Sequence, residues 1–199
     1  MDHTNPIDLI TLPVTTERLR LRLFTADDVD AMHAYQGLES VARYLYRPPH
    51  TRERCAEVID KISGPPRWAE NGDELVLAVT HADEPGVIGE VGVKLAAARA
   101  RQVEIGWVFH PAYEGRGYAT EAARALAALA FDALGAHRLY ARLDVENTAS
   151  AKVCERLGMR REAHLVENDL DGDRWGSEYV YAALAHDLER LPSTSGSAR

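Results

Sequence analysis

The chain has 199 residues, of which 46% are hydrophobic and 27% are charged. This length and composition fit one globular domain with a full apolar core, and they exclude collagen-like, low-complexity and largely disordered proteins. The formal charge is −8, from 31 acidic against 23 basic residues. This balance disfavours a nucleic-acid partner, because such binders rely on a basic surface.

The cysteines and the apolar stretches indicate the cellular compartment of the protein. Cys55 and Cys154 lie far apart, so no disulfide framework is expected and a reducing compartment is favoured. The most apolar stretch, 125–136, is interrupted by Asp132 and is shorter than a membrane span. Residues 1–10 lack the basic and apolar regions of a secretory signal. We therefore expect a cytoplasmic protein that has no membrane partner.

The two ends of the chain differ in composition from its middle. Residues 1–14 show no clear hydrophobic period, and the last residues are small and polar. The sequence predicts an N-terminal arm over 1–14, a single domain over 15–190 and a disordered tail over 191–199.

The first half of the domain alternates between strand and helix patterns. Residues 19–23 alternate leucine with arginine, a period of two that predicts a half-buried strand. Thr25 is a candidate N-cap of a helix that ends near Gly37. A second helix is expected from Thr51 to the Ser-Gly-Pro-Pro segment at 63–66, because proline pairs break helices.

The second half predicts a meander followed by crossover units. Three strand-like runs at 74–80, 87–95 and 102–109 are joined by short links, which favours antiparallel pairing. After Gly117 the apolar residues follow a helical period as far as Gly135. The remaining elements expected are a strand at 137–145, a helix at 147–157 and two strands at 160–168 and 174–184. Strand–helix–strand segments need a crossover, so the sequence predicts an α+β domain with a mixed sheet.

The segment at 114–120, EGRGYAT, joins a strand to a helix. Gly115 and Gly117 let the backbone approach a ligand closely, and the helix start adds unpaired N–H donors and partial positive charge. Arg116 adds a cation, so the loop suits a pyrophosphate. The alternative is a plain glycine-rich connection with an exposed arginine.

Other phosphate and metal sites are poorly supported by the sequence. Neither GxxxxGK[ST] nor a GxGxxG turn is present, which disfavours a protein that holds ATP or NAD on this loop. The eight histidines are scattered and form no cluster with cysteines, so no metal site is expected.

Several motifs in one order resemble the GNAT N-acetyltransferase superfamily, and its RimJ/RimL-like branch in particular. The acyl-CoA loop of the family, Q/R-x-x-G-x-G/A, corresponds to residues 114–119, although Glu114 replaces the usual first residue and is expected to point outward. The other matching motifs are Asn147-x-x-Ser150, ERLGM at 155–159, EIG at 104–106 and EYVY at 178–181. The resemblance covers roughly residues 74–184.

The resemblance implies a GNAT acyltransferase fold, with a mixed, mostly antiparallel twisted sheet of about six or seven strands flanked by about four helices. It implies acetyl-CoA as co-substrate, with the pyrophosphate on the amides of 115–120 and the pantetheine arm along the backbone of 107–109. Asn147 would bind that arm, Ser150 would lie near the sulfur, and Lys152 is a candidate for the adenosine-side phosphate. The implied cofactor-binding residues are Trp107, Val108, Phe109, Glu114, Gly115, Arg116, Gly117, Tyr118, Ala119, Thr120, Asn147, Ser150 and Lys152.

The implied chemistry is acyl transfer to an amine by direct attack in a ternary complex. A protonated amine cannot attack, so a base must take a proton. Glu104 is the candidate base, because the apolar residues beside it on its strand would bury it in part; the alternative is a solvated strand residue. Ser150 is the candidate donor to the departing CoA thiolate, and Asn147 could equally be only a helix cap.

The acceptor is expected to be a small-molecule or peptide amine, such as a protein N-terminus. The segment at 43–49 and Trp68, rich in aromatics and arginine, could line its groove, with plain packing as the alternative. The resemblance also suggests a homodimer. The second function that stays open is a non-catalytic GNAT-fold module that binds acyl-CoA or a partner protein. The acyl chain and the identity of the acceptor are not fixed by the sequence.

Overall fold

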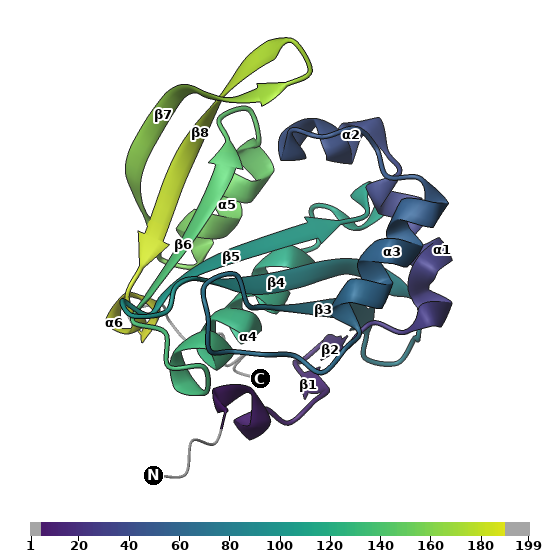
Figure 1. The fold of residues 1–199 in the computed structure, drawn as a ribbon, viewed down its shortest axis with the longest axis vertical. Coiled ribbons are helices and arrows are strands. Elements are labelled where there is room, and N and C mark those ends of the chain that lie inside the picture. Colours follow the sequence, from purple (N-terminus) through teal and green to yellow (C-terminus); the bar gives the residue numbers. More distant parts are fainter. Residues whose placement is uncertain (1–4, 190–199) are drawn as a thin grey trace, which may run out of the picture.

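Alternating buried and exposed side chains build a single mixed sheet (Figure 1). The computed structural model describes residues 5–189, and the tail expected at 191–199 lies outside them. Leu19 and Leu21 are fully buried while Arg20 between them is exposed, as the period of two predicts. The strands are β1 (Val14–Thr15), β2 (Leu19–Arg22), β3 (Glu74–His81), β4 (Val87–Ala97), β5 (Gln102–Phe109), β6 (Arg138–Asp144), β7 (Arg160–Asp171) and β8 (Arg174–Ala183).

The helices confirm the expected α+β fold and add short elements that have no detectable period. They are α1 (Val29–Gln36), α2 (Glu39–Ala42), α3 (Arg52–Ile62), α4 (Tyr118–Asp132), α5 (Thr148–Arg156) and α6 (Ala185–Glu189). The described residues thus hold eight strands and six α-helices, more than the six or seven strands and four helices predicted. The extra elements include β1, α2 and α6, which span two, four and five residues. Such short runs are too brief for a hydrophobic pattern.

Helix ends lie close to where the sequence places them. Thr51 caps α3, and its hydroxyl accepts a hydrogen bond of 3.1 Å from the backbone N–H of Arg54. Gly135 and Gly158 follow α4 and α5 with φ of 68° and 74°, the left-handed conformation that glycine adopts without strain. The helix expected from Thr25 begins instead with a 3-10 turn and becomes α-helical at Val29.

Helices cover both faces of the sheet. Ala122, Ala123 and Leu126 of α4 belong to the main core, together with alternate residues of β3, β4 and β5. Met32 of α1 and Ile59 of α3 belong to a second cluster that contains residues from the opposite face of the strands. Within the arm expected at 1–14, Ile7 is buried against the main core.

The order β1-β2-β3-β4-β5-β6-β8-β7 contains one parallel pair, β5 with β6. That pairing covers three positions, from Gln102 opposite Arg138 to Glu104 opposite Tyr140. Beyond Glu104 the two strands separate, and in Figure 1 strands β6, β8 and β7 turn away from β5 toward the top of the view. The residues between the separated strands are therefore available to line cavities.

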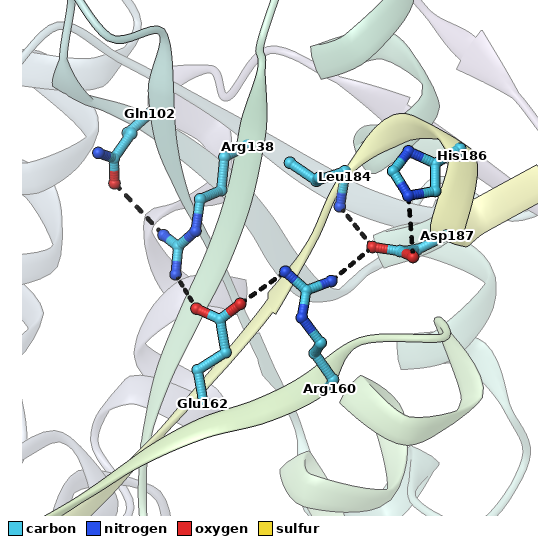
Figure 2. A network of polar contacts seen from close by, with 7 residues as sticks. All are labelled: Gln102, Arg138, Arg160, Glu162, Leu184, His186 and Asp187. Atoms are coloured by element: carbon cyan, nitrogen blue, oxygen red, sulfur yellow. Dashed lines mark hydrogen bonds and ion pairs between the residues drawn. The ribbon is translucent and has the colours of Figure 1, made fainter.

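A polar network closes the paired end of this split (Figure 2). Arg138 donates to Gln102 Oε1 at 3.3 Å and forms an ion pair with Glu162. Arg160 bridges the carboxylates of Glu162 and Asp187, each at 2.7 Å. These contacts tie β5, β6, β7 and α6 together, so they hold the strands where the split begins.

Candidate functional site

Two adjoining cavities occupy the split between β5 and β6. The larger has a volume of about 540 Å³ and lies toward the loop at 114–120, and the smaller, of about 340 Å³, extends over β4 and β5. We call them the loop groove and the strand cavity. Six residues line both: Tyr44, Leu45, Trp107, Val108, Asn147 and Ser150.

The loop groove brings together the sequence-predicted cofactor residues, with one difference. All of them line it except Arg116. The guanidinium of Arg116 instead lies over the Tyr113 ring, 5.9 Å from its centroid. Glu114, expected to point outward, is exposed and forms part of the groove wall. The loop therefore offers the groove its backbone rather than its arginine side chain.

The conformation of the loop fits an anion. Gly115 and Gly117 have φ of 74° and 81°, and Gly117 is the N-cap residue of α4. A Cβ on Gly115 would meet no heavy atom within 4 Å, so glycine is needed there for its backbone conformation rather than for space. The hydroxyl of Thr120 is buried and finds no partner within the described residues. N–H groups at a helix start and an unpartnered hydroxyl are donors that suit a diphosphate.

Two cations on α5 line the loop groove. Lys152 and Arg156 are four residues apart, which puts them on neighbouring turns of one helix face. Sequence reasoning singled out Lys152 and missed Arg156, although the i, i+4 spacing was a signal that could have found it. Together they provide positive charge for phosphate groups along the helix.

Ser150 lies where the two cavities meet. The side chain of Asn147 caps α5, and its Oδ1 accepts a hydrogen bond of 3.0 Å from the backbone N–H of Ser150. The Ser150 hydroxyl oxygen accepts a hydrogen bond of 3.2 Å from Trp107 Nε1. Because the indole is only a donor, the Ser150 O–H hydrogen stays available to another acceptor. The geometry therefore confirms the capping role of Asn147 and turns a serine donor toward the junction.

Glu104 lines the strand cavity and is half-buried. The Tyr140 hydroxyl donates to its carboxylate at 3.3 Å, across the last paired position of β5 and β6. Burial and the neighbouring Glu104 raise the pKa of Tyr140, so this phenol stays protonated as a donor. Lys94 is the cross-strand partner of Glu104 on β4. A carboxylate with a hydrogen-bond donor from Tyr140 thus lines the same cavity as Ser150.

The floor of the strand cavity is bare. Gly92 and Gly106 are cross-strand partners on β4 and β5, and both line the cavity. A Cβ on Gly106 would meet no heavy atom within 4 Å, which means that it would project into free space. A Cβ on Gly92 would instead meet the Val76 side chain at 3.3 Å, so the cavity owes open volume to Gly106.

The roof over both cavities comes from the segment expected to recognise the acceptor. Tyr44 and Leu45, in the 3-10 helix Arg43–Leu45, line both cavities. Tyr46 fixes this segment to the far side of the split, where its hydroxyl donates to Asp144 at 2.6 Å and lies 3.1 Å from the Ser177 carbonyl oxygen. Trp68 plays the packing role: it is buried and lines neither cavity.

Among residues 5–189 no group of three or more histidine, cysteine, aspartate or glutamate side chains could hold a metal ion. No helix in that range is long and apolar enough to cross a membrane.

Comparisons with known proteins agree with this geometry. The family model for the acetyltransferase (GNAT) domain matches residues 18–160. The chain is 33% identical over 171 residues to the uncharacterized N-acetyltransferase YnaD of Bacillus subtilis (strain 168), covering 86% of this chain and 96% of that protein. It is 24% identical over 148 residues to spermidine N(1)-acetyltransferase of Escherichia coli (strain K12), and the match covers 74% of this chain and 76% of that protein.

A solved structure shows the same architecture. The crystal structure of the acetyltransferase (GNAT family) from Bacillus anthracis superposes with a TM-score of 0.78 and 32% identity, and the match covers 87% of this chain and 98% of that one. The chain therefore belongs to the GNAT acetyltransferase family, and it is an acyl-CoA-dependent N-acetyltransferase that uses acetyl-CoA.

Proposed function

We propose that this enzyme acetylates a small cationic primary amine, with Glu104 as general base and Ser150 as donor to the leaving thiolate. The observation that carries this proposal is the meeting of the two cavities at Trp107 and Ser150. One cavity offers donors for a diphosphate, and the other offers a carboxylate for an amine. A bound thioester reaching Ser150 from the loop groove would meet an amine held beside Glu104.

The loop groove would hold acetyl-CoA. The N–H groups of 115–120 and the Thr120 hydroxyl would bind the pyrophosphate, and Lys152 and Arg156 would bind the adenosine-side phosphate. Trp107–Phe109 pair with β4 on one edge, and their other edge, which β6 no longer reaches, would bind the pantetheine arm as a strand does. The free amide of the capping residue Asn147 would donate to the same arm.

The acyl transfer would proceed by direct attack. Glu104 takes a proton from the ammonium of the acceptor, directly or through a water molecule, and frees the nitrogen lone pair. The nitrogen forms a bond with the thioester carbonyl carbon, and the C–S bond breaks with its electron pair left on the sulfur. The nitrogen then loses its second proton, which ends on the CoA thiolate to give the free thiol. The Ser150 hydroxyl donates a hydrogen bond to the thiolate that leaves. This hydrogen bond stabilises the negative charge on the sulfur, which makes the thiolate a better leaving group and favours formation of the amide.

The strand cavity favours a small cationic acceptor. Its wall carries three carboxylates, Glu74, Glu90 and Glu104, against the cations Lys94 and Arg142. Glu74 is paired with Lys61, and burial raises the pKa of Glu90, so Glu104 is the carboxylate that the proposal assigns to the acceptor. Arg142 is paired with Glu178, so less of its charge is available to the cavity. One relative is a spermidine N(1)-acetyltransferase. Spermidine and other small amines are therefore the first acceptors to test, with a peptide N-terminus as the competing outcome.

The test begins with binding and continues with turnover. Calorimetric titration should show one acetyl-CoA per chain, at a dissociation constant of about 1–100 μM. Release of free CoA thiol is then measured with a panel of amines and peptides. Glu104→Gln should lower kcat about a hundredfold and spare CoA binding. Glu84→Gln, in the exposed turn after β3, is the matched control. Turnover of peptide N-termini in preference to every small amine would overturn the proposed acceptor class.

Three finer features belong to the same proposal. The EIG and EYVY motifs support a RimJ/RimL-like enzyme. The two free, buried cysteines support a reducing, cytoplasmic setting.

The β7–β8 hairpin carries three exposed apolar residues, Val166, Leu170 and Trp175, and they support a homodimer. Light scattering of the purified protein tests the last point, and a monomer at all concentrations would overturn it.

A further inference from the structure

We propose that Arg18 is a positioning residue for acetyl-CoA: it holds the loop at 115–117 in the conformation that receives the pyrophosphate. This inference rests on the proposed role of that loop. Arg18 lies just before β2, far from the loop in the sequence, and does not line either cavity. It would therefore act on the co-substrate through the loop and not by contact.

The guanidinium of Arg18 joins three parts of the loop and its helix. Nη1 donates to the Arg116 carbonyl at 3.0 Å. Nε and Nη2 face the carboxylate of Glu121 at 2.7 and 2.6 Å. The same group lies over the Tyr118 ring, 4.8 Å from its centroid. A planar, rigid fork of donors can make these contacts at once, which a lysine cannot.

The carbonyl that Arg18 holds lies between the two glycines of the loop. Little else packs there, since a Cβ on Gly115 would meet no heavy atom within 4 Å. A Cβ on Gly117 would meet a single heavy atom within 4 Å, Nη2 of Arg18 at 3.5 Å. Both glycines have many backbone conformations available to them. The contact with Arg18 therefore restrains this backbone, together with the hydrogen bond of 3.0 Å from the Glu121 N–H to the Gly117 carbonyl.

The ion pair between Arg18 and Glu121 also neutralises the negative charge at the start of α4. Glu121 lies in the first turn, next to the donors that would bind the pyrophosphate, and an unpaired carboxylate there would repel it. Burial opposes ionisation, but hydrogen bonds from Thr16 and from the backbone and side chain of Arg18 hold the pKa of Glu121 below its ordinary value. Glu121 is therefore ionised at neutral pH, and Arg18 balances its charge.

The experiment compares two acetyl donors. Acetyl-CoA carries the pyrophosphate, and S-acetyl-pantetheine lacks both it and the nucleotide. Arg18→Gln should raise KM for acetyl-CoA about tenfold, the effect expected from losing hydrogen bonds to a charged group, while kcat changes less than about twofold. The kinetic constants for S-acetyl-pantetheine should not change. Calorimetric titration with free CoA should show the same loss as KM.

Two further variants make the test decisive. Arg18→Lys keeps a charge opposite Glu121 but cannot also reach the Arg116 carbonyl, so KM for acetyl-CoA should lie between those of the wild type and Arg18→Gln. Arg20→Gln changes an exposed arginine two residues further on, within β2, and should leave the kinetic constants for both donors unchanged. Thermal melting checks that each variant folds. If Arg18→Gln does not fold, the kinetic constants of Arg18→Lys decide the test.

Three results would overturn the inference. Equal losses of kcat/KM with both donors would make Arg18 a general structural residue. Full activity of Arg18→Lys would show that the contact with the loop is dispensable. If the wild type neither binds nor uses acetyl-CoA, the proposed function itself is wrong and the role of Arg18 falls with it.

Discussion

Trp107 Nε1 lies 3.2 Å from Ser150 Oγ and joins β5 to the start of α5 across the split in the sheet. Both residues line both cavities. The contact therefore marks the point at which co-substrate and acceptor would meet. It also fixes the serine hydroxyl as an acceptor toward the indole, which leaves its hydrogen for the thiolate.

Removing the hydroxyl should slow the reaction without weakening co-substrate binding. Ser150→Ala loses the donor to the thiolate, and we expect kcat to fall about a hundredfold. Trp107→Phe keeps an aromatic ring and the serine, so its loss should be smaller. Steady-state kinetics with calorimetric CoA titration measure both. A tryptophan variant as slow as the serine variant would show that the indole, and not the hydroxyl, carries the effect.

The hydrogen bond from Tyr140 should orient the Glu104 carboxylate within the strand cavity. Tyr140→Phe removes this donor, so kcat should fall about tenfold, the loss expected for a hydrogen bond to a charged group, while CoA binding measured by calorimetry is unchanged. Tyr179→Phe, on β8 and outside both cavities, is the matched control. A Tyr140→Phe variant with the kcat of the wild type would show that this hydrogen bond does not position the base.

The bare floor of the strand cavity should control acceptor size. Gly106→Ala adds a methyl group that projects into free space over β5, and its φ is not in the left-handed region, so the backbone should tolerate the change. We expect kcat/KM to fall for bulky amines more than for small ones, with CoA binding preserved. Gly86→Ala, in a turn where a Cβ also meets nothing, is the control. Equal losses for all amines would exclude a role in selection.

Local patterns explain why much of the fold and the loop groove could be predicted. The strands at 74–109 and the helix after Gly117 have clear periods, and the loop and the α5 motif each lie within a few residues. Arg116 shows the limit of this reasoning. Its place in the loop is fixed by sequence, but no local pattern predicts that its guanidinium lies over the Tyr113 ring and lines neither cavity.

Contacts between distant residues could not be predicted from one sequence. Tyr46 and Asp144 are 98 positions apart, and Arg18 and Glu121 are 103 apart. Neither pair leaves a periodic signal, because the fold alone brings its members together. The roof of the cavities and the support of the loop depend on these pairs. Short elements such as α2 are missed for the related reason that they are held by tertiary contacts and not by propensity.

The pair Arg22–Asp28 predicts how stability depends on pH. The Asp28 side chain is 9% exposed, and it accepts from Arg22 at 2.7 and 2.8 Å and from the backbone N–H of Thr25 at 2.8 Å. Burial opposes ionisation, but these donors hold the pKa of Asp28 below its ordinary value of 3.8. The stability that it provides is thus fully present above pH 3.8 and is lost as the pH falls through the lower folded value.

Asp28→Asn should therefore lower the free energy of unfolding by about 2 kcal/mol at pH 7, the loss expected for hydrogen bonds to a charged group. The difference in unfolding free energy between variant and wild type should shrink once the pH drops below the pKa of Asp28 in the unfolded chain. At that pH the Asp28 carboxylate of the wild type begins to lose its charge as well. Urea unfolding from pH 7 to pH 3 measures it. Asp30→Asn is the control, since its pair with Arg52 is solvent-exposed and should contribute little. A difference that stayed constant down to pH 3 would show that packing of Asp28, and not its charge, supports the turn before α1.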